Sequence, residues 1–150
     1  MVTRESIDDF LAQKTLAVVG ASRDRKKFGN KAYRDLINKG YKVYAVNPHA
    51  ETVEGAKCYP ALAALPERVG GIVVVVPPQE TEKTVSAAKA AGITRVWLQP
   101  GAESAAAVKY CDENGVRVVH DICILMEAKP TAFFHRFHRF FARLGGKVPK

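Results

Sequence analysis

The stretch VVGASRDRKKFGN, residues 18–30, joins an apolar segment to a turn of small residues and then to a run of cations. Small side chains at 20–22 let a backbone approach an anion closely, and Ser22 adds a hydroxyl. A helix that begins near Gly29 or Asn30 would point its N–H groups and about half a positive charge at the same spot. The stretch therefore predicts a phosphate or diphosphate site. A tight turn without a ligand is the alternative.

The cations that follow this turn are concentrated rather than spread along the chain. Residues 23–42 hold eight Lys or Arg and two acids, and residues 128–150 hold six and no acid, within a chain of net charge +8. A uniformly basic coat is typical of general nucleic-acid affinity, whereas two focal patches favour a local anionic partner. The first patch includes Arg23, Arg25, Lys26 and Lys27, which directly follow the small-residue turn.

Alternating apolar strands and amphipathic helices predict the framework that positions this turn. The expected strands are residues 15–19, 41–46, 71–76, 94–98 and 116–119, and helical patterns lie near 6–12 and within 30–40, 79–92 and 103–115. The pattern predicts the α/β class, as a Rossmann-like, doubly wound parallel five-stranded sheet with helices on both faces. Ligands of such sheets bind at the carboxyl ends of the strands. We therefore expect the functional residues in the five loops that follow the strands.

The second of these loops narrows the choice of nucleotide. NAD-binding folds usually end this strand with an Asp or Glu that holds the ribose hydroxyls, but here Asn47 and Pro48 follow it. The glycine after Gly20 is Gly29, so the G-x-G-x-x-G fingerprint is absent and a standard NAD site is disfavoured. A missing acid beside a basic patch favours a nucleotide with an extra ribose phosphate. On charge alone, coenzyme A and NADP both remain open.

Five segments stand in order at the predicted strand ends. They read AVVGASRDRKKFGNKAYRDLINKGYKVYAVNP, VEGAKCYPALAALP, VVVVPP, VWLQPGAES and VVHDICILME. Together they cover roughly residues 14–127, and they resemble the small stand-alone CoA-binding proteins, relatives of the CoA-binding domain of the succinyl-CoA synthetase alpha subunit. The resemblance implies a Rossmann-type domain that binds coenzyme A or an acyl-CoA as a non-catalytic carrier, sensor or regulatory module.

The same resemblance implies a place along the coenzyme for each loop. The phosphates would lie at Gly20, Ala21, Ser22 and Arg23, and the nucleotide along Asn47 and Pro48. The adenine or pantetheine wall would be formed by Val76, Pro77 and Pro78, and the pantetheine arm would lie beside Gln99, Pro100 and Gly101. Arg25, Lys27, Asn30 and His49 complete the predicted cofactor-binding set. The synthetase domain has a lysine shortly after the proline of its second-strand loop, where this chain has His49 and Ala50. Arg23, Arg25 or Lys27 is therefore the candidate substitute for the contact with the 3′-phosphate.

The segment after the fifth strand holds the parts of a nucleophilic site without the expected geometry. An imidazole, a carboxylate and a thiol occur at His120, Asp121 and Cys123. Neighbouring residues of an extended segment point to opposite faces, so we expect His120 to face away from Asp121. We expect a binding protein rather than an enzyme, and Cys123 to be a packing residue, with a mixed disulfide to the CoA thiol as the alternative. The chain ends before the synthetase's second domain, so ligase chemistry is not expected.

Length and composition predict one domain of 150 residues, with a core at 14–127 and a helical extension at 128–150. An aromatic stripe in that extension is expected to pack on the sheet or on a second copy of the chain; its members are Phe133, Phe137, Phe140, Phe141 and Leu144. No apolar run would span a bilayer and no signal peptide is visible, so we expect a cytoplasmic protein. The cysteine and histidine spacing predicts no disulfide framework and no metal site.

Two other function classes remain as alternatives. An NADP-linked oxidoreductase would need a Tyr-x-x-x-Lys pair after the fourth strand, which the sequence lacks. A nucleic-acid-binding protein would use the two basic patches but would leave the strand-end motifs unexplained.

Overall fold

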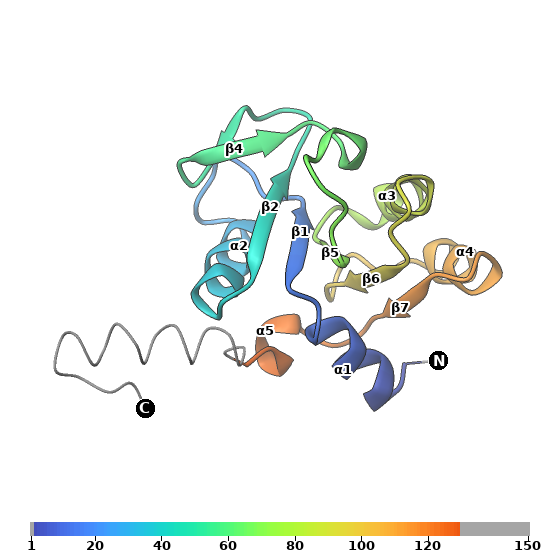
Figure 1. The fold of residues 1–150 in the computed structure, drawn as a ribbon. Coiled ribbons are helices and arrows are strands. Elements are labelled where there is room, and N and C mark those ends of the chain that lie inside the picture. The colour runs from blue at the N-terminus through green and yellow to red at the C-terminus, as the bar shows by residue number, and fades with distance from the viewer. Residues whose placement is uncertain (1, 130–150) are drawn as a thin grey trace, which may run out of the picture.

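A seven-stranded sheet with helices on both faces forms the described part of the chain, residues 2–129 of the computed structural model (Figure 1). The sheet order is β3-β4-β2-β1-β5-β6-β7, and every pair is parallel except β3 with β4. The strands are β1 (Thr15–Val19), β2 (Lys42–Val46), β3 (Thr52–Val53), β4 (Ala56–Tyr59), β5 (Gly71–Val74), β6 (Arg95–Leu98) and β7 (Arg117–Val119). The helices are α1 (Arg4–Leu11), α2 (Phe28–Asn38), α3 (Pro78–Ala90), α4 (Ala105–Glu113) and α5 (Ile124–Glu127), with a 3₁₀ turn η1 at Leu62–Ala64.

The predicted fold class is confirmed, and the predicted strand count was too low. All five expected strands are present, and the sheet gains the short strands β3 and β4 at one edge. These two strands form a hairpin whose two-residue turn is Glu54 and Gly55, both with positive φ. Strands of two and four residues are too short for periodicity to reveal them. The aromatic stripe predicted at the C-terminus, and most of the helical extension that carries it, lie at residues 130–150, which are outside the described part of the chain.

Each face of the sheet carries its own core. Leu16 and Val18 of β1 face α1, α2 and α5, whereas Ala17 faces α3 and α4. This alternation follows from the period of two along a strand and explains the continuous apolar run of β1, which is buried on both sides. Within residues 2–129, no helix has both the length and the apolar character needed to cross a membrane.

The chain reverses its direction of travel across the sheet at β1. From β1 it moves outward to β2 and the hairpin, then returns to β5 on the other side of β1 and continues to β7. The loops after β1 and β5 therefore separate in opposite directions at the carboxyl edge of the sheet. This is the edge at which the first small-residue turn lies.

Candidate functional site

Gly20 closes the end of β1 against two neighbouring strands. Its N–H donates to the carbonyl of Val46, at 3.2 Å, and its φ is +118°. A Cβ at this position would stand 2.3 Å from the carbonyl oxygen of Val75. Only glycine fits both the backbone conformation and the space. The turn after β1 consequently presents bare backbone at the strand ends.

Gly29 brings the N-terminus of α2 directly onto this turn. A Cβ on Gly29 would stand 2.6 Å from the carbonyl oxygen of Gly20 and 3.1 Å from the nitrogen of Ala21. The helix begins at Phe28, close to the predicted Gly29 or Asn30, and Lys27 is its N-cap. The Lys27 side chain makes no capping hydrogen bond within the described range, so the first turn of α2 keeps N–H donors and the positive end of its dipole for an anion.

Asn30 shapes the turn from inside the protein. Its side chain is fully buried, accepts a hydrogen bond from the Ser22 N–H at 2.8 Å and donates one to the Ser22 carbonyl at 2.7 Å. Asn47, directly after β2, donates to the Ala21 carbonyl at 2.9 Å and accepts from the His49 N–H at 2.8 Å. Of the two asparagines predicted as coenzyme contacts, Asn30 therefore joins the turn after β1 to α2, and Asn47 joins that turn to the loop after β2.

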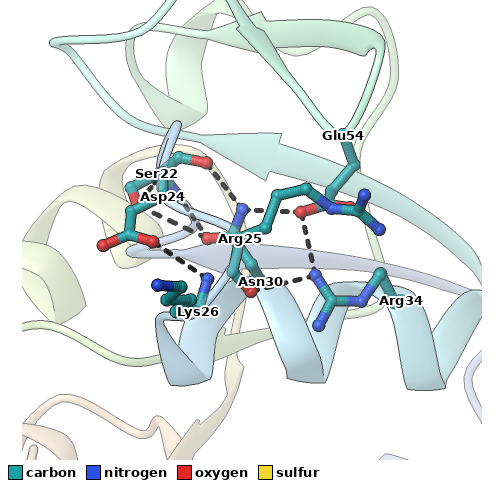
Figure 2. A network of polar contacts seen from close by, with 7 residues as sticks. All are labelled: Ser22, Asp24, Arg25, Lys26, Asn30, Arg34 and Glu54. Carbon is teal, nitrogen blue, oxygen red and sulfur yellow. Dashed lines mark hydrogen bonds and ion pairs between the residues drawn. The ribbon is translucent and has the colours of Figure 1, made fainter.

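Glu54, at the tip of the β3–β4 hairpin, joins this arrangement from a distant part of the chain (Figure 2). Its carboxylate accepts from Asn30 at 2.9 Å and forms ion pairs with Arg34 at 3.0 Å and Arg25 at 3.1 Å. The hydrogen bond from Asn30 and the charges of the two arginines hold the pKa of Glu54 below its usual value. Glu54 thus fastens the hairpin to the turn after β1.

The predicted cations surround this turn on its solvent side. Arg23, Arg25 and Lys27 are all exposed, and Arg23 and Arg25 border a cavity of about 400 Å³. Thr52, Glu54 and Gly55 of the hairpin form its opposite wall. A second cavity, of about 560 Å³, lies at the loop after β2; its lining residues are Pro48, His49, Ala50, Glu51, Lys57, Cys58 and Pro60.

The loops after β5 and β6 are fastened to each other by Thr81 of α3. Its buried hydroxyl donates to the carbonyl of Ala102 at 2.5 Å. Pro77 and Pro78, predicted as part of the coenzyme wall, form the exposed start of α3, and Val76 is half-buried beside them. Pro77 cannot cap α3 with its side chain, so this second helix N-terminus also opens at the carboxyl edge.

Gln99 turns inward from the end of β6, whereas Pro100 and Gly101 are exposed. The Gln99 side chain is 2% exposed, accepts from the Ile124 N–H at 2.7 Å and donates to the Cys123 sulfur at 3.5 Å. The thiol predicted to be a packing residue is thus half-buried beside a residue predicted to line the pantetheine arm.

The structure corrects the prediction that His120 faces away from Asp121. The His120 Nδ1 and the Asp121 carboxylate are 2.5 Å apart. The segment is not extended here, because Asp121 has a φ of +65° and bends the chain directly after β7. Alternation of faces holds only while a segment remains extended.

Two residues of this edge escaped the sequence analysis, Glu54 and Thr81. The dipeptide Glu54-Gly55 between a valine and an alanine was a usable turn signal, since a glycine in a two-residue loop favours a hairpin. The link between Thr81 and Ala102 had no sequence signal, because it depends on how two loops meet in space.

Comparison with known proteins gives a consistent set of similarities. A family model described as CoA binding domain matches residues 14–129. Among curated proteins, ADP-forming acetate–CoA ligase I of Archaeoglobus fulgidus is 30% identical over 123 residues, which are 75% of this chain and 18% of that protein. The alpha subunit of ADP-forming acetate–CoA ligase II of Pyrococcus furiosus is 28% identical over 129 residues, 79% of this chain and 28% of that subunit. The chain therefore spans less than a third of the length of these two relatives.

Solved structures of small proteins match over most of their length. A conserved hypothetical protein of Pyrococcus furiosus is 39% identical with a TM-score of 0.73, over 77% of this chain and 99% of that one. A hypothetical protein of Pyrococcus horikoshii is 35% identical with a TM-score of 0.79, over 84% of this chain and 89% of that one. These matches show that the fold of this chain is shared with other small proteins.

Proposed function

Because the chain belongs to the CoA binding domain family, we propose that it binds coenzyme A or an acyl-CoA at the carboxyl edge of its sheet. We further propose that it does so as a non-catalytic carrier, sensor or regulatory module. The proposal rests on one observation above all. Gly20 and Gly29 pack the end of β1, the carbonyl of Val75 and the start of α2 so closely that no Cβ fits at either glycine.

This packing suits a diphosphate. The turn offers backbone without side chains, the first turn of α2 offers N–H donors, and Arg23 and Lys27 are exposed beside them. From this point the nucleotide would extend toward Asn47 and Pro48, and the pantetheine arm toward the exposed Pro100 and Gly101. Coenzyme A, when bound, supplies the thiol; the residues of this chain bind its phosphates and orient its two ends.

A non-catalytic role is favoured by what surrounds Cys123. Its sulfur accepts a hydrogen bond from the buried Gln99, while His120 contacts Asp121. In the described part of the chain, no hydrogen bond links this thiol to an imidazole or a carboxylate that would act as its base.

The proposal is tested by thermal unfolding of the purified chain with coenzyme A, acetyl-CoA and NADP in parallel. A ligand at 100 times its dissociation constant adds about 2.7 kcal/mol to the free energy of unfolding. We expect a clear rise in midpoint temperature with coenzyme A or acetyl-CoA, well above that with NADP. A shift with NADP alone would contradict the proposal.

A second measurement identifies the physiological ligand. Mass spectrometry of protein denatured directly from a cell extract releases whatever the site carries, and we expect coenzyme A or an acyl-CoA in stoichiometric amount. Another nucleotide in its place would refute the assignment.

A further inference from the structure

The cavity between the first turn and the hairpin carries an excess of positive charge. Arg23 and Arg25 line this cavity, and Glu54 is the one carboxylate among the described residues of its lining. Arg34 of α2 forms an ion pair with Glu54. Arg25 and Arg34 thus pair with this acid, and Arg23, in the cavity lining, adds a third positive charge. Thr52 adds a hydroxyl on the hairpin side. A phosphate monoester, with a charge of about −1.5 to −2 at neutral pH, is the kind of group that this balance suits.

Arg25 is fixed along one edge of its guanidinium group and open along the other. Its Nε donates to Glu54 Oε1 at 3.1 Å, and its two terminal nitrogens make no hydrogen bond to any residue between 2 and 129. The side chain is 74% exposed. Paired terminal N–H groups match two oxygens of one phosphate, which is the strongest geometry available to an arginine.

The carboxylate that holds Arg25 is itself held. The Glu54 side chain is only 8% exposed and is fixed by Asn30 at 2.9 Å and Arg34 at 3.0 Å (Figure 2). Arg25 therefore rests on a rigid partner before any ligand arrives. Ordering an arginine in advance reduces the entropy that binding must otherwise remove.

The neighbouring cavity at the loop after β2 is less suited to a dianion. Its lysine, Lys57, is balanced by the charge of Glu51 in the same lining. Charge balance therefore favours the cavity beside Arg25 as the place of a phosphate monoester.

We propose that the ribose 3′-phosphate of coenzyme A binds in the cavity beside the hairpin, with Arg25 as its principal contact and Glu54 as the residue that positions Arg25. This inference rests on the proposed function and deepens it. It assigns the discrimination between coenzyme A and its 3′-dephospho form to a two-residue hairpin turn that lies 29 positions from Arg25 in the sequence.

The test is calorimetric titration of the full chain with coenzyme A and with 3′-dephospho-CoA, and the readout is the ratio of the two dissociation constants. We expect the wild-type chain to prefer coenzyme A by about tenfold or more, since hydrogen bonds between charged groups are at stake. Arg25→Gln should reduce this ratio to nearly one while leaving the affinity for 3′-dephospho-CoA almost unchanged. Because the Arg25 side chain is exposed, its replacement leaves the core intact, and circular dichroism checks that the variant is folded.

Lys26→Gln is the matched control, because it removes the same charge from the adjacent residue. Lys26 does not line the cavity, and Figure 2 shows it on the side of the turn away from Glu54. It should leave the ratio as in the wild type. Glu54→Gln keeps Arg25 but removes the charge that holds its guanidinium group, so the ratio should fall to a value between those of the wild type and Arg25→Gln. If Glu54 had only a structural role, the substitution would weaken the binding of both ligands equally.

Three results overturn the inference. These are a wild-type ratio near one, an Arg25→Gln variant that keeps the wild-type ratio, and a ratio that collapses in Lys57→Gln instead. Tight binding of coenzyme A in the same titrations would leave the proposed function standing in each case. A wild-type chain that binds neither compound would overturn both.

Discussion

At the scale of single residues, Asn30 links segments that are far apart in the chain. Its amide group satisfies both backbone groups of Ser22 and also the carboxylate of Glu54. The sequence analysis predicted Asn30 as a coenzyme contact, and in the structure its side chain bonds Ser22 and Glu54. Asn30 would therefore affect a bound ligand by fixing the conformation of the turn after β1.

Replacing this amide tests its structural weight. We expect Asn30→Ala to lower the free energy of unfolding by about 1–3 kcal/mol, because the N–H of the half-buried Ser22 and one oxygen of Glu54 lose a partner. Urea unfolding measures the change. Asn38→Ala, at the exposed end of the same helix, is the control and should change stability by less than about 0.5 kcal/mol. Equal effects of the two substitutions would show that the hydrogen bonds of Asn30 contribute nothing to stability.

Asp9 is a second residue whose charge joins distant segments. It lies on α1 and pairs with Arg95 of β6 at 2.8 Å and Arg117 of β7 at 3.1 Å. The hydrogen bond from Arg95, with the charges of both arginines, lowers the pKa of Asp9 in the folded protein. The unfolded chain therefore binds this proton at higher pH than the folded chain does.

The pH dependence follows from that difference. The stabilisation by Asp9 is complete above the ordinary pKa of an aspartate and is lost as the pH falls through the lower folded-state pKa. We expect wild type to be more stable than Asp9→Asn at about pH 7, and the gap to close below about pH 4. Urea unfolding across this range measures the gap. Asp8→Asn, at an exposed site on the same helix, should show a smaller gap; a gap for Asp9→Asn that persists in acid would contradict the assignment.

At the scale of elements, the contact between the turn after β1 and the start of α2 is set by packing. Gly29 is the second residue of α2, and in a helix alanine is intrinsically favoured over glycine by up to about 1 kcal/mol. The space between Gly29 and the Gly20 carbonyl nevertheless excludes a methyl group. Propensity and packing thus make opposite predictions for the same substitution.

Whether Gly29→Ala raises or lowers the free energy of unfolding decides between propensity and packing. We expect Gly29→Ala to destabilise the fold by about 1–2 kcal/mol, because overpacking outweighs the gain in propensity, and to weaken coenzyme A binding by displacing α2 from the turn. Urea unfolding and calorimetry measure the two effects. Lys31→Ala, on the exposed side of α2, should alter neither by much. A stabilised Gly29→Ala variant with unchanged affinity would refute this account of the site.

The elements that the sequence predicted correctly are those with strong periodicity. Strand β1 and the helices near 30–40, 79–92 and 103–115 carry long apolar patterns, and all four were found within a few residues of their predicted ends. The β3–β4 hairpin was missed because its strands of two and four residues hold no repeating pattern. The bend at Asp121 was missed because a positive φ at a non-glycine residue depends on tertiary packing. The backbone of the site was predictable, whereas its side-chain links were not.

At the scale of the whole molecule, one sheet separates two cores that share every central strand. Trp97 of β6 packs on Phe10 of α1 with ring centroids 5.3 Å apart, and its indole N–H donates to the Ile122 carbonyl at 2.8 Å. Its neighbours Val96 and Leu98 belong to the other core, with α3 and α4. Neither core can lose its strands without exposing the other, which favours a single cooperative unit.

Trp97, the chain's one tryptophan, makes that cooperativity measurable. Its side chain is fully buried in the core beside α1, whereas far-ultraviolet circular dichroism reports the helices of both faces. We expect both signals to give the same unfolding midpoint in urea. Coenzyme A at about 100 times its dissociation constant should raise the free energy of unfolding by about 2.7 kcal/mol, whichever of the two signals is used to measure it. The proposed ligand site lies where strands from both cores end, so we expect binding to stabilise both. Separate midpoints, or a ligand shift in one signal only, would show that the two faces unfold independently and that the domain is not one unit.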